Sequence, residues 1–355
     1  MPDIAADWSR SYRVVQWATG NVGARALRRV IEHPGLELVG VWVHSPAKVG
    51  RDAGELAGVA PVGVLATGSI EDVIALRPDC VLYMPHVMDF DEVCRLLESG
   101  ANVITTRTEF QNPSALDSAV RARVEEACRR GNTSIHGTGS SPGFISEAMP
   151  IVLTSIQRRL DCLTIYEFAD IAGRNSPEML FDRMGFGKAP GPVPQGRLDH
   201  LRDAFGPSLG LVAQALGLPF DSVEVGGSQA VAREDTSIAA GLVPAGTVAA
   251  TRSMVTGMRG GKALMRFVAT WYLSTNVETL DGEEWLFRDS GWRVLVEGDC
   301  PLDISITYPV KPEDYGDMTP GLTAHRPVNA VPYVCAADPG IVTTMDLPQI
   351  VARLA

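Results

Sequence analysis

Short apolar runs alternate with helix-forming segments over residues 1–145. The runs are rich in β-branched residues and are apolar on both faces. Strands are predicted at YRVVQWA (12–18), LELVGVWVH (36–44), DCVLYMP (79–85), ANVITT (101–106) and NTSIHG (132–137), with helices at 21–32, 69–76, 90–98 and 114–130. Because strands of this kind, separated by helices, form a parallel sheet covered on both faces, we predict a doubly wound α/β domain.

The pattern changes after residue 145. Long segments of alternating strand character follow, with glycine or acidic turns between them: DSVEVGGSQAVA, TVAATRSMVTGMRGG, ALMRFVATWYLS and WRVLVEGDCPLDISITYPV. This pattern predicts a largely antiparallel sheet in an α+β domain over 146–322. The last segment, 323–355, contains the helix-forming stretch AHRPVNAVPYVCAA. This segment could return to the first domain.

The turn between the first strand and the first helix contains two glycines three residues apart. In VVQWATGNVGARALRRV these are Gly20 and Gly23, while Ala18 stands where the G-x-G-x-x-G motif has its first glycine. Small residues let the backbone approach a pyrophosphate, and the helix N-terminus offers free N–H groups. An ordinary strand-to-helix turn is the alternative, but the position in a first βαβ unit favours dinucleotide binding. The residues predicted to hold the pyrophosphate are Thr19, Gly20, Asn21, Val22 and Gly23.

The end of the second strand bears on the choice of cofactor. In NAD-binding domains an acidic residue there holds the ribose hydroxyls, whereas VHSPAKVGRD contains no acid before Asp52. His44, Ser45, Lys48 and Arg51 could instead meet a 2'-phosphate. NADP is therefore favoured, and NAD remains possible if these residues form only a solvated loop.

Two further segments lie at carboxyl ends of predicted strands, where ligands bind in such sheets. Pro85 and His86, at the end of the strand predicted at 79–85, are expected beside the nicotinamide half of the cofactor, as is Thr106 at the end of the strand predicted at 101–106. Glu109, in TTRTEF, is expected to face the cleft between the domains. A partly desolvated carboxylate there can exchange protons near neutral pH, although an ordinary surface glutamate is the alternative.

Composition narrows the class of partner. A formal net charge of −11 argues against a nucleic-acid surface, so a small-molecule substrate is expected. The sequence has no apolar leader and no membrane-spanning run, and a cytoplasmic protein is predicted. The six cysteines are scattered and the histidines lack metal-site spacing, so no metal is expected.

Four segments together resemble one family: WATGNVGARALRRV, YMPHVMDFDEVCRLLESGANVITTRTEF, HGTGSSPGF and RPVNAVPYVCAADPG. They resemble the dihydrodipicolinate-reductase-like superfamily, in the branch of 2,4-diaminopentanoate dehydrogenase and bacterial native amine dehydrogenases. The resemblance covers nearly the whole chain and is loose between residues 183 and 310. The resemblance implies a homodimer that performs reversible NAD(P)H-dependent reductive amination. It also implies that Glu109 matches the family glutamate that exchanges protons with ammonia. IYEFADIAGRNSPEMLFDRMGFG lacks the histidines of true dihydrodipicolinate reductases, which argues against that activity.

The substrate side is predicted from aromatic and apolar residues with few charges among them. The pocket candidates are Phe144, Tyr166, Phe168, Met179 and Trp271, each of which could alternatively belong to the core. Such a pocket suits a small ketone or aldehyde, but Glu167 or Asp170 facing inward would favour a diamine. Asn329 is expected to bond the nicotinamide amide or a substrate oxygen, with helix capping as its alternative.

We therefore expect an NADP-preferring amine dehydrogenase that aminates small carbonyl compounds with ammonia. The alternatives are a 2,4-diaminopentanoate-type or amino acid dehydrogenase, and a non-catalytic NADP-binding sensor that kept only the fold.

Overall fold

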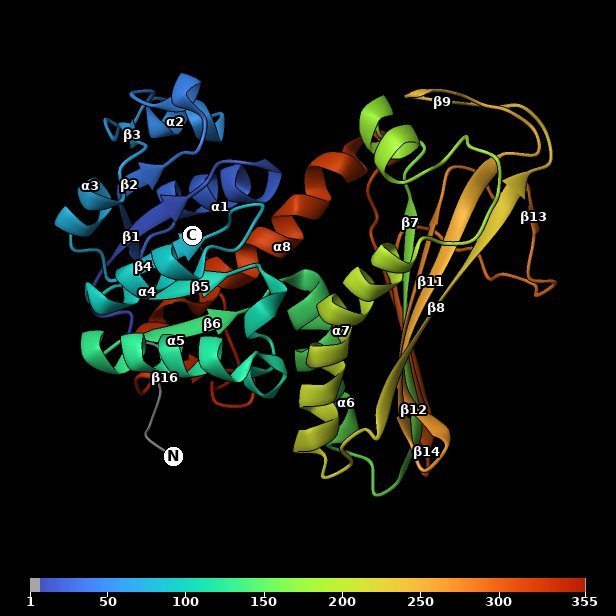
Figure 1. The fold of residues 1–355 in the computed structure, drawn as a ribbon. Helices are drawn as coiled ribbons and strands as arrows, with labels where there is room; N and C mark the ends of the chain where they lie inside the picture. The colour runs from blue at the N-terminus through green and yellow to red at the C-terminus, as the bar shows by residue number, and fades with distance from the viewer. Residues whose placement is uncertain (1–6, 355) are drawn as a thin grey trace. The chain divides into compact units, whose positions relative to one another are not determined.

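The computed structural model describes residues 7–354, and the chain divides into two compact units (Figure 1). The first unit contains the described residues up to Phe144 together with those from Pro320 onward. The second unit is Ile145–Thr319. The described part of the segment that the sequence-based division begins at residue 323 therefore belongs to the first unit.

The first unit contains a seven-stranded sheet in the order β16-β6-β5-β4-β1-β2-β3, and all its strand pairs are parallel. Its strands are β1 (Tyr12–Trp17), β2 (Leu36–Trp42), β3 (Ala66–Thr67), β4 (Cys80–Tyr83), β5 (Asn102–Thr105), β6 (Ser134–Gly137) and β16 (Gly340–Val342). Its helices are α1 (Asn21–Ile31), α2 (Ala53–Ala57), α3 (Ile70–Ala75), α4 (Phe90–Glu98) and α5 (Ser118–Gly131), with short 3-10 turns η1 (Pro46–Lys48), η2 (Thr108–Phe110) and η3 (Pro113–Ala115).

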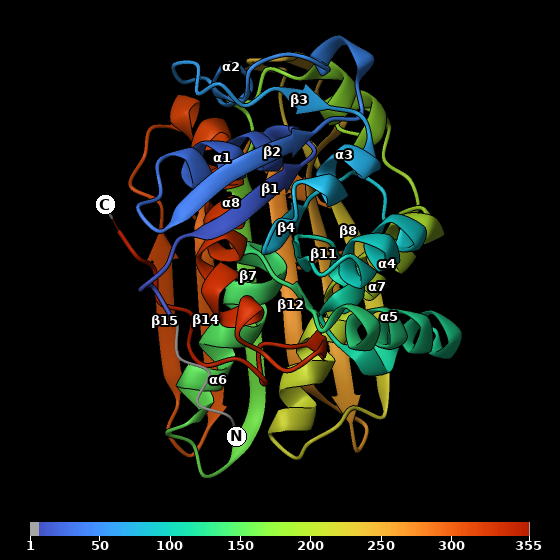
Figure 2. The same ribbon diagram turned by 90° about the vertical axis from the view of Figure 1, so that its left-hand side faces the viewer.

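Both faces of this sheet are covered, as the apolar strands require. Figure 2 shows α1 and α8 (Pro312–Cys335) on one side of the sheet and α4 and α5 on the other. Alternate strand residues supply the two cores: Val14 and Leu82 pack with Val328 of α8, while Val15 and Val81 pack with α4 and α5. The predicted doubly wound domain is confirmed.

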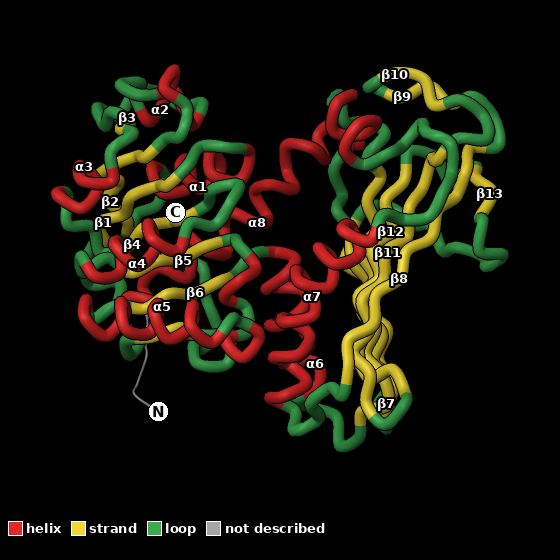
Figure 3. Tube along the Cα trace, viewed as in Figure 1, coloured by secondary structure: helices red, strands yellow, loops and turns green. Residues whose placement is uncertain are grey.

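The second unit is dominated by a mixed seven-stranded sheet, which appears as the long yellow strands of Figure 3. Its order is β13-β8-β11-β12-β7-β14-β15, and every pair is antiparallel except β12 with β7. The strands are β7 (Leu160–Asp170), β8 (Ser222–Ala232), β11 (Val248–Arg259), β12 (Lys262–Tyr272), β13 (Val277–Thr279), β14 (Gly291–Gly298) and β15 (Leu302–Thr307), and β9 (Thr236–Ile238) pairs with β10 (Gly241–Val243). The helical segments are η4 (Ser140–Ala148), which begins in the first unit, α6 (Met149–Thr154), η5 (Glu178–Arg183) and α7 (Gln195–Ala215). The predicted largely antiparallel sheet of an α+β domain is confirmed.

The two faces of this second sheet differ. Helix α7 covers one of them, which we call the α7 face: the Phe205 ring of α7 stacks on Phe267 of β12 at 3.9 Å between centroids. Residues of β7, β11 and β12 alternate between this face and the opposite face. Met254, on the opposite face, is 40% exposed. The sheet therefore buries one side in its own unit and leaves apolar surface on the other.

Candidate cofactor and catalytic site

The turn between β1 and α1 has the backbone that a phosphate-binding turn requires. Ala18, in the place of the missing first glycine, has φ +70°, a conformation that glycine adopts more readily. A Cβ on Gly23 would lie 2.2 Å from the Ala18 carbonyl oxygen, so this position must be glycine for α1 to pack against the turn. A Cβ on Gly20 would meet nothing within 4 Å. The turn is therefore tight on the protein side and open at Gly20.

The N-terminus of α1 is suited to an anion. Gly20 is its N-cap and makes no side-chain cap bond, and no acidic residue lies in the first turn, which begins Asn21-Val22. The first N–H groups of a helix lack partners within the helix, and its dipole is positive at this end. A pyrophosphate fits both features.

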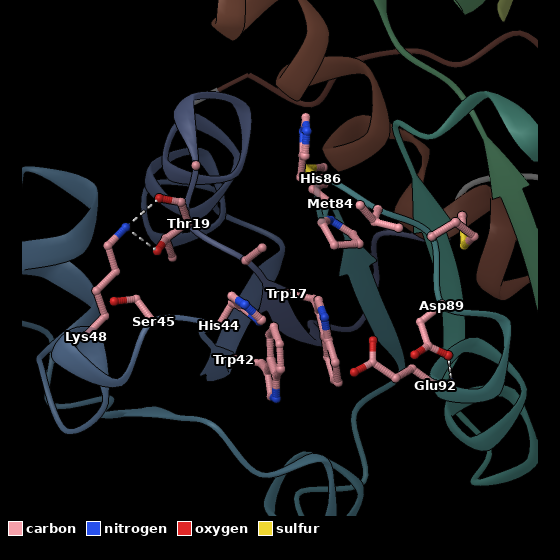
Figure 4. A pocket seen from close by; sticks show the side chains of 15 residues that line it. Trp17, Thr19, Trp42, His44, Ser45, Lys48, Met84, His86, Asp89 and Glu92 are labelled. Carbon is pink, nitrogen blue, oxygen red and sulfur yellow. Dashed lines mark hydrogen bonds between the residues drawn. The ribbon is translucent and has the colours of Figure 1, made fainter. Parts of the chain in front are cut away.

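A cavity of about 650 Å³ opens beside this turn, within the first unit (Figure 4). It lies between the ends of β2, β1 and β4, where the strand order reverses and ligands of doubly wound sheets bind. Of the residues predicted to bind cofactor, the cavity brings together Thr19, Gly20, His44, Ser45, Lys48, Pro85 and His86. Sequence reasoning missed the other lining residues: Trp17, Ala18, Trp42, Met84, Val87, Met88, Asp89 and Glu92.

Lys48 reaches back from the loop after β2 to the glycine turn. Its Nζ donates to the Thr19 carbonyl oxygen at 2.9 Å and to the Thr19 hydroxyl at 3.0 Å, as the dashed lines of Figure 4 show. Arg51, predicted to act with it, does not line the cavity and lies 3.6 Å from Glu55. The lysine therefore brings positive charge to the cavity, whereas the arginine forms an exposed ion pair.

An aromatic stack forms one wall of the cavity. The Trp17 and Trp42 rings stack at 4.2 Å between centroids, and Tyr83 lies at 5.4 Å from Trp17 (Figure 4 shows the two indoles). The Tyr83 hydroxyl donates to Glu92 Oε2 at 2.7 Å, and burial raises the pKa of both groups. The buried Trp17 Nε1 has no hydrogen-bond partner in the part of the chain that the structure describes. This wall therefore includes an aromatic surface and an unused N–H donor.

Glu109 lies in η2, directly after the end of β5. Arg107 Nη2 donates to Glu109 Oε1 at 2.7 Å, and Arg107 Nη1 donates to the His86 carbonyl oxygen at 2.9 Å. The two side chains are 29% and 25% exposed. Glu109 Oε2 and Arg107 Nε are buried and have no hydrogen-bond partner among residues 7–354. One carboxylate oxygen is thus engaged, and the other is buried with no partner in the described chain.

Sequence reasoning missed Arg107, although the arginine two positions before the glutamate in TTRTEF was a usable signal. Arg107 connects the loop after β4 to the segment after β5, because its two terminal nitrogens bond to one group from each. Its backbone N–H donates to the Thr105 hydroxyl at 3.0 Å, which fixes the chain on either side of Thr106. The guanidinium therefore sets the position of the carboxylate.

Asn329 lies well inside α8, so its alternative role as a helix N-cap is wrong. Its Oδ1 is buried and lacks a hydrogen-bond partner in the described part of the chain. Asn329 is not among the residues that line the cavity.

The five residues predicted to line the substrate pocket do not share one wall, and that prediction requires correction. Tyr166 and Phe168 pair in register with Val268 and Thr270 on the opposite face of the second sheet, whereas Trp271 is on the α7 face. The side chain of Met179, in η5, contacts Arg174 Nη1 at 3.6 Å. Phe144 belongs to the first unit, where the Arg326 guanidinium lies 5.9 Å from its ring centroid. Because successive residues of a strand point to opposite faces, Tyr166 and Phe168 lie on a different face from Trp271, although composition alone grouped them.

Within residues 7–354, no group of three or more histidine, cysteine, aspartate or glutamate side chains could hold a metal ion. No helix in that range has the length and apolar character needed to cross a membrane.

Comparison with known proteins gives matches along nearly the whole chain. The model of the dihydrodipicolinate reductase N-terminus matches residues 14–130, and that of the 2,4-diaminopentanoate dehydrogenase C-terminal domain matches residues 197–355. An amine dehydrogenase of Streptomyces virginiae is 29% identical, covering 94% of this chain and 95% of that protein. A 2,4-diaminopentanoate dehydrogenase of Acetoanaerobium sticklandii is 23% identical, covering 95% and 93%.

A solved structure has the same fold. The amine dehydrogenase from Mycobacterium smegmatis superimposes with a TM-score of 0.74 at 20% identity, over 97% of this chain and 98% of that one. The resemblance predicted from the four sequence segments is confirmed. The chain belongs to the branch of the dihydrodipicolinate-reductase-like superfamily that includes 2,4-diaminopentanoate dehydrogenase and amine dehydrogenases, a branch of NAD(P)-dependent oxidoreductases.

Proposed function

We propose that this protein is an NADP-preferring amine dehydrogenase that interconverts small ketones or aldehydes and primary amines, with ammonia as the nitrogen source. The observation that carries the proposal is the Glu109 carboxylate, which has one oxygen fixed by Arg107 and the other buried without a partner in the described chain. The relatives named amine dehydrogenase and 2,4-diaminopentanoate dehydrogenase support the same reaction class.

The first unit fits a nicotinamide dinucleotide, which supplies hydride chemistry when it is bound. The open space at Gly20 and the bare N-terminus of α1 suit the pyrophosphate. Trp17 Nε1 offers a donor to a buried acceptor, and about 650 Å³ is the volume of a typical small-molecule site. The preference for NADP rests on Lys48, His44 and Ser45 in the cavity and on the lack of an acid in the segment that directly follows β2.

Glu109 acts as the base and then as the acid in the proton transfers of the amination. Ammonia at neutral pH is mostly ammonium, which cannot attack a carbonyl until a base removes a proton. Glu109 Oε2 takes that proton. It then returns a proton to the hydroxyl of the carbinolamine that ammonia forms with the carbonyl compound, and this hydroxyl leaves as water. The carboxylate also stabilises the iminium cation that accepts the hydride. Arg107 keeps Oε1 occupied, so the proton is exchanged at Oε2.

We also infer that two copies of the chain associate through the opposite face of the second sheet. Met254 supplies exposed apolar surface there, and the same face carries two ion pairs: Arg252 lies 2.9 Å from Asp281, and Arg293 lies 2.7 Å from Asp303. A face of this kind can meet its own copy across a two-fold axis. Multi-angle light scattering should give the mass of a dimer for the wild type and a shift toward monomer for Met254→Glu. A monomeric wild type overturns this inference.

The activity is tested by Glu109→Gln, which keeps the size of the side chain and removes the proton acceptor. Oxidation of NADPH in a panel of carbonyls with ammonium should fall by roughly a hundred- to ten-thousand-fold. Affinity for NADPH, measured by quenching of tryptophan fluorescence, should not change. Glu71→Gln is the matched control, because Glu71 pairs with Arg95 at 2.6 Å on the surface of the same unit.

Two results would contradict the proposal. If Glu109→Gln turns over like the wild type, the carboxylate has no role in the reaction. If the wild type binds NADPH but no carbonyl with ammonium consumes it, the protein is a nucleotide-binding sensor.

A further inference from the structure

A buried glutamine holds the backbone where β1 enters the glycine turn. Gln16, the residue before Trp17 in β1, is 0% exposed. Its Nε2 donates to the Trp17 carbonyl oxygen at 3.1 Å and to the Ala18 carbonyl oxygen at 2.9 Å. Because both partners are acceptors, the amide nitrogen must be the atom that faces them. The side chain therefore bonds to two consecutive carbonyls of the same short stretch of backbone.

This orientation leaves the amide oxygen of Gln16 unpaired. Gln16 Oε1 is buried and has no hydrogen-bond partner among residues 7–354. An unpaired buried acceptor costs stability, and an aliphatic side chain at this position would avoid that cost. The two bonds from Nε2 are the interactions that offset it, and both go to the backbone that leads into the turn.

The bond to Ala18 acts on a residue with an unfavourable backbone conformation. Ala18 has φ +70°, in the left-handed region, where a Cβ crowds the following carbonyl oxygen. A glycine, which the G-x-G-x-x-G motif has at this position, adopts such a φ without strain. The Ala18 N–H donates to the Trp42 carbonyl oxygen at 2.9 Å, and its own carbonyl accepts from Gln16, so the residue is held at both of its peptide groups.

The Ala18 carbonyl is also the group against which α1 packs. A Cβ on Gly23 would lie 2.2 Å from the Ala18 oxygen and 3.1 Å from Gln16 Nε2, so all three groups are close together. A rotation of the Ala18 peptide would move this oxygen and change the fit of α1 on the turn. The bond from Gln16 opposes that rotation.

The same bond sets the direction of the next N–H group. In a planar trans peptide the N–H points opposite to the C=O, so fixing the Ala18 carbonyl also fixes the Thr19 N–H. Lys48 does the same one residue later, because its bond to the Thr19 carbonyl fixes the Gly20 N–H. Thr19 and Gly20 line the cavity, and backbone N–H groups at such a turn are the donors that hold a phosphate.

We propose that Gln16 is a positioning residue for the cofactor. Its amide holds Ala18 in the left-handed conformation that the missing glycine would otherwise provide, and so keeps the turn in the shape that receives the pyrophosphate. Gln16 is fully buried and does not line the cavity, so it acts through the turn and not by touching the dinucleotide. The inference rests on the dinucleotide binding of the proposed function, but not on which amine is oxidised.

The test is a double-mutant cycle between Gln16 and Ala18, with the dissociation constant of NADPH measured by titration calorimetry. Gln16→Met keeps the length of the side chain and should weaken binding about ten-fold, as expected for the loss of a buried hydrogen bond. Ala18→Gly alone should stay within about two-fold of the wild type, since φ +70° suits glycine. In the Ala18→Gly background, Gln16→Met should cost no more than about three-fold, because glycine keeps a positive φ without the amide. NADH should give the same pattern, because the turn serves the pyrophosphate of either dinucleotide.

Asn102→Leu is the matched control, because Asn102 is another amide that bonds to the backbone of the same sheet. Its Nδ2 donates to the Asp79 carbonyl oxygen at 2.9 Å, and its Oδ1 accepts from the Ser134 N–H at 2.8 Å. Asn102 begins β5, so it lies at the end of that strand opposite to the one that faces ligands. Its loss should lower Tm and leave NADPH affinity within about two-fold, whereas Gln16→Met should change both.

Thermal unfolding without cofactor completes the cycle and covers a variant that is unstable. Gln16→Met should lower Tm, and should lower it less in the Ala18→Gly background. If Gln16→Met does not fold but the double variant folds and binds NADPH, the positioning role is supported. If Gln16→Met binds NADPH like the wild type, or if its effects are the same in both backgrounds, Gln16 only fills space in the core and the inference is overturned. If the wild type binds no dinucleotide, the proposed function fails, while the Tm cycle still shows whether Gln16 holds Ala18.

Discussion

Replacing either glycine of the β1–α1 turn by alanine should separate folding from cofactor binding. At Gly23 the added methyl would lie 2.2 Å from the Ala18 carbonyl oxygen, 3.0 Å from the Ala18 carbonyl carbon and 3.1 Å from Gln16 Nε2. Real contacts of this kind do not fall below 3.0 Å, so α1 must move from the turn by at least about 0.8 Å. At Gly20 the methyl meets nothing within 4 Å, and φ of −73° suits any residue.

The magnitudes follow from these contacts. Forcing an extra methyl into a packed site costs about 1–3 kcal/mol, which for a unit of this size lowers Tm by roughly 2–12 °C. Gly23→Ala should therefore unfold earlier and bind NADPH more weakly, because the helix that receives the pyrophosphate has moved. Gly20→Ala should keep or slightly raise Tm, since alanine restricts the unfolded chain. Its methyl should nevertheless weaken NADPH binding by occupying the approach to the phosphates.

The assay is thermal unfolding without cofactor, followed by NADPH titration of tryptophan fluorescence. Each glycine variant serves as the control for the other. The reasoning is refuted if Gly23→Ala has the Tm and affinity of the wild type, or if Gly20→Ala is the less stable of the two.

Further predictions concern charge and pH in the first unit. Lys48→Ala should weaken NADPH binding about ten-fold and NADH binding less, measured as dissociation constants. Arg107→Met should lower kcat by up to roughly a hundred-fold by releasing Glu109, with Arg107→Lys intermediate and NADPH affinity unchanged. Burial lowers the pKa of His33 and His136 to about 4, so both are neutral in the folded chain at pH 6 and can protonate only on unfolding. The stability present above pH 6.5 should therefore be lost as the pH falls toward 4, and urea unfolding of His136→Asn should show a shallower pH slope.

Local patterns predict the long, regular elements well and the short ones poorly. The apolar runs that become β1, β4, β5 and β6 are almost entirely buried, and β2 is partly buried, which explains why their composition predicts them. The short elements α2 and β3, with five and two residues, follow no period long enough to detect. Their stability comes from tertiary contacts, such as the Asp52 side chain that caps α2 at Gly54 N.

The residues of the candidate site were also predictable from the sequence only in part. The glycine turn, the cavity residues after β2, and Pro85 and His86 after β4 were predictable, because parallel strands bring their carboxyl ends to one edge. The split of Tyr166 and Phe168 from Trp271 was not predictable, since it depends on the register between strands distant in sequence. The bonds from the Trp271 and Trp292 indoles to Glu167 depend on the same pairing, and Trp292 comes from β14. Pairing of this kind leaves no trace in local spacing.

Arg107 links the proposed catalytic carboxylate to the loop after β4. The guanidinium donates both to Glu109 and to the carbonyl of His86, and His86 itself lines the cofactor cavity. A ligand that shifts the loop after β4 must therefore move the arginine, and the arginine must either carry Glu109 with it or release it. Because misplacement by about 1 Å can cost roughly a hundred-fold in rate, the loop's conformation bears directly on turnover. Substitutions at the exposed Val87 should therefore change kcat, although Val87 takes no part in the reaction. We expect them to act by moving the carbonyl of the neighbouring His86.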